Sequence, residues 1–127
     1  MYEDYSKEQL ALLANHNEFL VRWSVAKHPN TSPETLDHLA NDEVKDVRQY
    51  VALNRNTPPE TLERLANDEK WSVRWYVAYN PNTSPETLVR LANDWDWTVR
   101  LGVTKNPNTP QYIKDYLKIK KFLNYYG

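Results

Sequence analysis

The chain has 127 residues, a formal net charge of −1 at pH 7 and no cysteine. Its length suits one domain with a modest core, and 40% hydrophobic with 26% charged residues is typical of a globular, soluble chain. The missing cysteines exclude a disulfide framework, a thiolate zinc site, a cysteine-held iron–sulfur cluster and a thiol nucleophile. Because no apolar run could span a membrane and Met1–Asp4 is acidic, unlike a signal peptide, we expect a cytoplasmic protein without membrane association.

The first predicted helix covers about residues 6–14. Ser6 and Gln9 are spaced as an N-terminal capping box, in which each side chain bonds the other residue's backbone amide. Leu10, Leu13 and Ala14 then follow at the spacing of one helical face. We predict that residues 1–19 form an N-terminal cap.

A motif with a period of 26 residues follows, as the positions of Leu36, Leu62 and Leu88 show. Four arginines keep the same period: Arg22, Arg48, Arg74 and Arg100. Repeats of this length are typical of solenoids, in which each unit buries its apolar face only against its neighbours. We therefore predict an all-α solenoid of about four two-helix repeats over residues 20–109, as part of a single domain spanning 1–127.

One helix of each repeat is predicted from Thr-Ser-Pro-Glu or Thr-Pro-Pro-Glu, at 31–34, 57–60 and 83–86. Threonine as the N-cap with glutamate three residues later is a capping box, and proline in the first turn loses no intrahelical hydrogen bond. Leucine and alanine then recur at helical spacing. We predict long helices at about 32–41, 58–67 and 84–93.

The other helix of each repeat is predicted to start at Asp46, Ser72 or Thr98, all residue types that favour the N-cap. It would run for about two turns and end at Asn54, Asn80 or Asn106. This short length leaves open whether the element is α or 3₁₀. Beyond it, residues 110–127 are predicted to form a longer closing helix that covers the last core face.

The motif Val-Arg-x-x-Val-Ala, then Asn-Pro-Asn-Thr-Pro, then Glu-x-Leu-x-x-Leu-Ala-x-Asp resembles the leucine-rich repeat variant family over about residues 10–117. The resemblance implies a right-handed superhelix of alternating α- and 3₁₀-helices without strands, similar in spirit to HEAT-type arrays. It implies no established catalytic activity. Some members carry an iron–sulfur cluster in a separate cysteine-containing segment, which this chain lacks, so no cofactor is expected.

The four repeating arginines are predicted to be structural. On a helical wheel Arg74 falls between Val73 and Ala78, on the buried side, where a guanidinium needs a paired acceptor. Candidate partners repeat with the same period: Asp42, Asp68 and Asp94, each of which could bridge neighbouring arginines. In the first repeat His16 holds this position, as a substitution at the end of the stack. The alternative is that the arginines contact a phosphate backbone.

The aromatic content of 13%, with five tryptophans and nine tyrosines, is high for a thin solenoid, so some rings should reach the surface. The side of the short helices opposite the valines varies between repeats, as binding surfaces of repeat proteins do. Because tryptophan and tyrosine anchor protein interfaces, we predict a protein-binding face, unless the rings only pack adjacent repeats together. Its residues are Trp23, Tyr50, Trp71, Trp75, Tyr76, Tyr79, Trp95 and Trp97.

Catalysis and metal binding find little support. His16, His28 and His38 lack a metal-ligand spacing, and no nucleophile elbow, phosphate loop or zinc-protease motif occurs. A nucleic-acid-binding array remains the alternative function, with aromatic rings beside lysines stacking bases and holding phosphates. Those lysines are Lys27, Lys105, Lys114, Lys118, Lys120 and Lys121. The net charge of −1 argues against this alternative.

Overall fold

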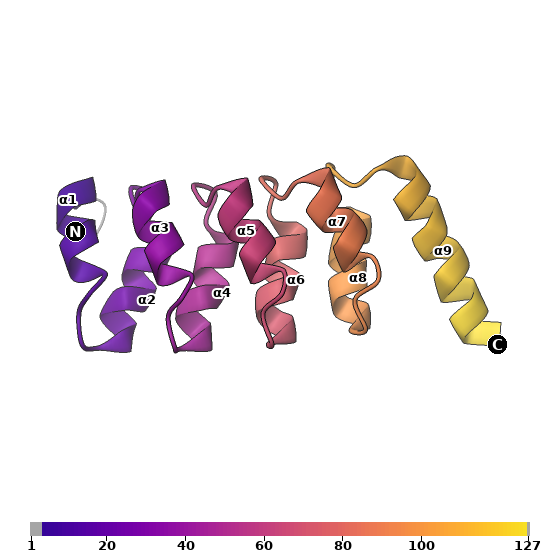
Figure 1. Ribbon diagram of the computed structural model, residues 1–127, viewed down its shortest axis with the longest axis horizontal. Coiled ribbons are helices and arrows are strands. Elements are labelled where there is room, and N and C mark those ends of the chain that lie inside the picture. The colour runs from indigo at the N-terminus through magenta and orange to yellow at the C-terminus, as the bar shows by residue number, and fades with distance from the viewer. Residues whose placement is uncertain (1–3, 127) are drawn as a thin grey trace.

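The computed structural model describes residues 4–126, which form nine α-helices and no strand within that range. In chain order these are α1 (Lys7–Leu13), α2 (Phe19–Lys27), α3 (Pro33–Leu39), α4 (Lys45–Leu53), α5 (Pro59–Leu65), α6 (Trp71–Tyr79), α7 (Pro85–Leu91), α8 (Trp97–Lys105) and α9 (Gln111–Tyr126). Figure 1 shows them in a single row from the N-terminus to the C-terminus. The predicted all-α solenoid is confirmed. Within the described range, no helix is long and apolar enough to cross a membrane.

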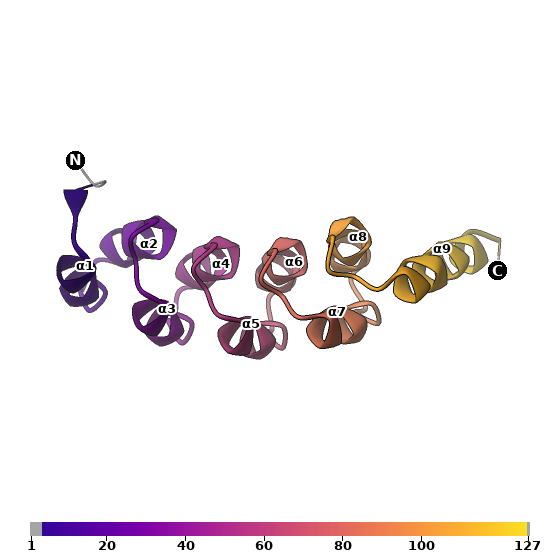
Figure 2. The ribbon, with the colours of Figure 1, turned by 90° about the horizontal axis from the view of Figure 1, so that it is seen from above.

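The helices form two layers (Figure 2). The layer of α2, α4, α6 and α8 is continuous because each of these helices packs directly on the next. The other layer, α1, α3, α5 and α7, packs mainly on the first layer. Figure 2 shows the row bending so that α2, α4, α6 and α8 line its concave side. We call them the inner helices, and the other four the outer helices.

The outer helices are shorter than predicted. Each of α3, α5 and α7 has seven residues, whereas each inner helix has nine, so the predicted long and short elements are reversed in length. The cause is an early stop: Ala40 and its equivalents are already C-caps, after which the chain turns. The inner elements are α-helices, which settles the alternative that their length left open.

The predicted threonine caps of the outer helices are wrong by one residue. Ser32 and Ser84 are the N-caps, and their hydroxyls accept from the amides of Thr35 and Thr87. In the middle repeat Pro58 stands at this position and gives no side-chain cap. The preceding threonines are fully buried, and their hydroxyls donate to a carbonyl at the end of the previous inner helix. At the N-terminus, the predicted capping box of Ser6 and Gln9 is confirmed.

The inner helices start two residues earlier than predicted, so that Asp46, Ser72 and Thr98 lie in the first turn. Their N-caps are Val44, Lys70 and Asp96. The start is set by the aspartate two residues before each cap, because its Oδ1 accepts the amide of the cap residue at 2.9 Å. The predicted ends at Asn54, Asn80 and Asn106 are confirmed as C-caps.

One continuous core runs between the two layers. The outer helices supply repeating leucines such as Leu62, and the inner helices supply pairs such as Val73 and Val77, all fully buried. Ile113 and Leu117 of α9 are also buried, so the closing helix covers the end of this core. The predicted terminal caps, 1–19 and 110–127, include residues 1–3 and 127, which lie outside the described residues.

Buried asparagines join neighbouring repeats, a feature that the sequence patterns did not predict. Asn80 donates from Nδ2 to the carbonyls of Ala52 and Asn54, at 2.7 and 3.0 Å, and accepts the amide of Asn82. Asn54 and Asn106 make equivalent bonds. Each asparagine satisfies carbonyls at the end of the previous inner helix that have no intrahelical partner, so the repeats are linked by buried hydrogen bonds.

Candidate interaction surface

The structure brings the repeating arginines and aspartates together as an arginine–aspartate ladder. Arg48 donates from Nε and Nη2 to the carboxylate of Asp68 at 2.7 and 3.2 Å, and from Nη1 to the carbonyl of Asp42 at 2.8 Å. The pairs of Arg22 with Asp42 and Arg74 with Asp94 have the same two-bond geometry. Each aspartate thus binds one arginine through its carboxylate and the next through its carbonyl.

The arginine donors of this ladder are already bound by groups of the fold. The side chains of Arg74 and Asp94 are each 7% exposed, and a planar guanidinium that is already forked onto a carboxylate has no free edge for phosphate. The hydrogen bonds that Arg22 donates to the Asp42 carboxylate also raise the pKa of Arg22 above its ordinary value. The first three arginines are thus each paired with an aspartate within the fold.

The two ends of the ladder differ from its middle. His16 replaces the aspartate of the first repeat: its Nδ1 accepts the amide of Glu18, and its carbonyl accepts from Arg22. At the other end, Arg100 donates from Nη1 to the carbonyl of Asp94 but forms no ion pair among the described residues. The residue at the aspartate position of its repeat is Lys120.

Six of the eight predicted aromatic residues form one connected run across α2, α4 and α6. The ring of Trp23 stands edge-on to Tyr50 at 5.2 Å between centroids, and Tyr50 lies 6.4 Å from Tyr76. From Tyr76 the run continues to Trp75 at 5.0 Å. Trp75 in turn contacts Trp71 at 6.2 Å and Tyr79 at 5.3 Å. We call these six residues the aromatic run.

The rings of the aromatic run are partly exposed on the concave layer. Trp71 is 45% exposed and the other five are half-buried; Trp23, Tyr50, Trp75 and Tyr76 pack against the core. Lys27 places its ammonium 4.1 Å from the centroid of Trp23, a cation–π contact. The contacts of Trp23 with Tyr50 and of Tyr50 with Tyr76 join neighbouring repeats, and part of each ring of the run remains exposed.

The remaining two predicted residues lie apart from the run. Trp95 is 79% exposed and stands over the guanidinium of Arg74 at 5.7 Å, where it covers a rung of the ladder. Trp97, 65% exposed, lines a cleft between α8 and α9. Neither ring contacts another aromatic ring among the described residues. The residues of the predicted face therefore lie in three separate locations: the aromatic run, Trp95 beside Arg74, and Trp97 at the α8–α9 cleft.

Gly102 ends the aromatic run. It holds the position that Tyr50 and Tyr76 hold in the earlier repeats. A Cβ atom there would lie 2.8 Å from the Cβ of Ala78 and 3.2 Å from the ring of Tyr79, so α8 approaches α6 too closely for a side chain. The ring of Tyr79 occupies this space instead, as the last ring of the run.

Two carboxylates have shifted acidities, both through local hydrogen bonds. The Thr61 hydroxyl, and then Arg64, hold the pKa of Asp37 below its usual range. The Thr98 hydroxyl likewise lowers the pKa of Asp96 at the start of α8. Both groups serve helix starts and contacts between outer helices. No group of three or more histidine, aspartate or glutamate side chains in residues 4–126 could hold a metal ion.

Comparisons with known proteins point to one family. A family model described as leucine rich repeat variant matches residues 46–70 and 71–96. A solved structure described as a leucine-rich repeat variant with a novel repetitive protein structural motif matches with a TM-score of 0.67 and 31% sequence identity. The match covers 83% of this chain and 42% of that chain, so this chain spans about two fifths of its length. A search of curated proteins finds no match.

Proposed function

Since the chain belongs to the leucine-rich repeat variant family, whose fold is a stack of helical repeats, we propose that it is a non-enzymatic scaffold that binds a protein partner. The aromatic run is the proposed contact surface. The observation that carries the proposal is the continuity of the run: six half-buried or exposed rings join three consecutive inner helices on the concave layer.

The packing of the repeats on one another does not require these rings. The same inner-helix positions hold Ser24, Gln49 and Gly102 in other repeats, and those repeats still pack. Large aromatic side chains bury much area at low entropic cost and dominate the energetics of protein interfaces. The rings are also already held by contact with one another, so a partner would order few side chains on binding.

A nucleic-acid partner has less support from the arrangement of charge. Of the lysines proposed to hold phosphates, only Lys27 contacts the aromatic run. Lys118, Lys120 and Lys121 lie on α9, beyond the point where Gly102 ends the run. Stacking of bases with concurrent phosphate contacts needs rings and cations side by side. We therefore place protein binding first.

The test compares proteins recovered by the wild type and by a Trp75→Ala/Tyr79→Ala variant. Trp95→Ala is the matched control, because it removes an exposed tryptophan that lies outside the run. We expect a defined set of partners to be lost with the double variant and retained with the control, with both variants still folded by circular dichroism. Equal recovery by all three proteins would count against the proposed surface. Binding of an oligonucleotide that weakens steeply with salt would favour the nucleic-acid alternative.

A further inference from the structure

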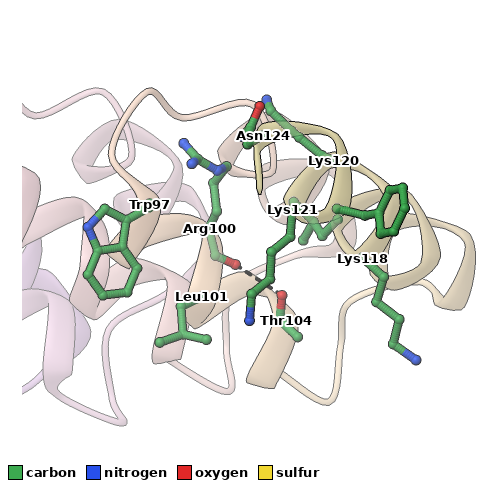
Figure 3. A pocket seen from close by; sticks show the side chains of 10 residues that line it. Trp97, Arg100, Leu101, Thr104, Lys118, Lys120, Lys121 and Asn124 are labelled. Atoms are coloured by element: carbon green, nitrogen blue, oxygen red, sulfur yellow. Dashed lines mark hydrogen bonds between the residues drawn. The ribbon is translucent and has the colours of Figure 1, made fainter. Parts of the chain in front are cut away.

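A cleft lies between α8 and α9, apart from the aromatic run. It has a volume of about 780 Å³, and Figure 3 shows its lining side chains. Four of its ten lining residues are cationic and none is acidic: Arg100, Lys118, Lys120 and Lys121. The chain as a whole carries a net charge of −1, so this local excess of positive charge is a specific feature of the cleft.

Arg100 is the one ladder arginine whose fork is unfilled among the described residues. In the three earlier repeats, Nε and Nη2 of the equivalent arginine donate to a carboxylate. Arg100 keeps the third bond of the pattern, from Nη1 to the carbonyl of Asp94 at 2.6 Å, so its guanidinium is held by the fold. The guanidinium of Arg100 therefore holds two donors, Nε and Nη2, in a fixed position. In the earlier repeats the equivalent donors bind an aspartate carboxylate.

Lysines of α9 add charge at the same place. The Tyr116 hydroxyl donates to Asn93, next to Asp94, and the ammonium of Lys120 lies 5.7 Å from the Tyr116 ring. These contacts hold Lys120 near the end of the ladder. In Figure 3, Lys120 and Arg100 both extend toward the upper end of the cleft, whereas Lys121 lies toward its lower end.

Apolar side chains complete the lining. Trp97 and Leu101 of α8 are 65% and 39% exposed, and Phe122 of α9 is 60% exposed. A simple inorganic anion would leave this apolar surface in water. A peptide that carries an acidic residue beside an apolar one would satisfy both parts of the cleft.

We propose that the α8–α9 cleft binds an acidic peptide segment of a partner protein, with an aspartate or glutamate carboxylate on the fork of Arg100 and an adjacent apolar side chain against Trp97 and Leu101. The peptide carboxylate takes the place that Asp42, Asp68 and Asp94 take in the earlier rungs. This site is separate from the aromatic run and does not depend on the function proposed for it.

The test measures fluorescence anisotropy of a labelled, amidated peptide of alternating aspartate and leucine, against a twin with asparagine in place of aspartate. The wild-type full chain should bind the acidic peptide at least about tenfold more tightly than the twin, because a fork onto a carboxylate is charge-assisted. Arg100→Gln should weaken binding about tenfold. If Arg100→Gln fails to fold, the double variant Lys120→Gln/Lys121→Gln, which changes side chains outside the core, takes its place. It should also bind the acidic peptide more weakly than the wild type.

Two further arms separate the alternatives. Trp75→Ala/Tyr79→Ala should bind the acidic peptide like the wild type, whether or not the aromatic run has a partner of its own. Equal affinity for the two peptides, or unchanged affinity in Arg100→Gln or in Lys120→Gln/Lys121→Gln as its replacement, would overturn the proposal. Tighter binding of single-stranded oligothymidine, lost in the same variant, would also overturn it, because the cleft would then be a phosphate site.

Discussion

Asp68→Ala tests the structural role of the arginine–aspartate ladder. The Asp68 side chain is 9% exposed, and its carboxylate accepts two bonds from Arg48 and one from the amide of Lys70 at the start of α6. The substitution leaves Arg48, 11% exposed, with only the carbonyl of Asp42. Removing one partner of a buried pair costs about 3–5 kcal/mol. Since Arg48 keeps one bond, we expect a loss of about 3 kcal/mol of unfolding free energy.

Urea unfolding followed by circular dichroism measures this loss. Glu63→Ala is the control, because Glu63 pairs with Arg90 at 3.8 Å with both side chains at least half exposed, where a pair contributes less than about 1 kcal/mol. A total stability of about 5–15 kcal/mol makes the expected difference easy to resolve. If Asp68→Ala and Glu63→Ala lower stability equally, the ladder is not what holds the inner helices in register.

Three further substitutions test other contacts. Asn80→Ala should cost about 2–3 kcal/mol in urea unfolding, because two carbonyls and one amide lose a buried partner; a variant as stable as wild type would contradict this. Gly102→Ala should lower the melting temperature, since overpacking of about 1–3 kcal/mol exceeds a helix-propensity gain of about 1 kcal/mol. An Ala78→Gly background should relieve that cost, and no relief would refute the steric account. The folded-state pKa of Asp37 is depressed, so its ionised carboxylate stabilises the fold at pH values above the unfolded-state pKa of about 4. That stabilisation is lost as the pH falls through the folded-state pKa. Asp37→Asn should therefore cost less than about 1 kcal/mol at pH 7 and progressively less as the pH falls through the folded-state pKa, and a difference that persists undiminished in acid would refute the assignment.

The repeat period was enough to predict the architecture, and the helical wheel was enough to place Arg74 on the buried side of its helix. Valine and leucine positions fix which side of each helix faces the core, and Arg74 follows from its place beside Val73. The starts of α3 and α7 were predicted one residue too early because threonine and serine are both good caps. Only the structure shows that the Thr83 hydroxyl bonds the Val77 carbonyl, which leaves the cap to Ser84.

The arrangement of the surface could not be derived from the repeat pattern. Curvature depends on how closely the inner helices pack relative to the outer ones, and Gly102 permits a close approach of α8 to α6. The separation of Trp95 and Trp97 from the other rings likewise depends on turn geometry that no periodicity encodes. The unfilled fork at Arg100 did have a sequence signal, since Lys120 stands where the period places an aspartate.

The proposed partner lies on the concave layer, against the aromatic run. Site-specific photo-crosslinking tests it directly, with a benzophenone amino acid placed at Trp71 on α6 or at Glu63 on α5, both exposed positions but on opposite layers. We predict that partner adducts form from position 71 and not from position 63. Adducts from position 63 alone would contradict the account, because the partner would then lie on the outer helices.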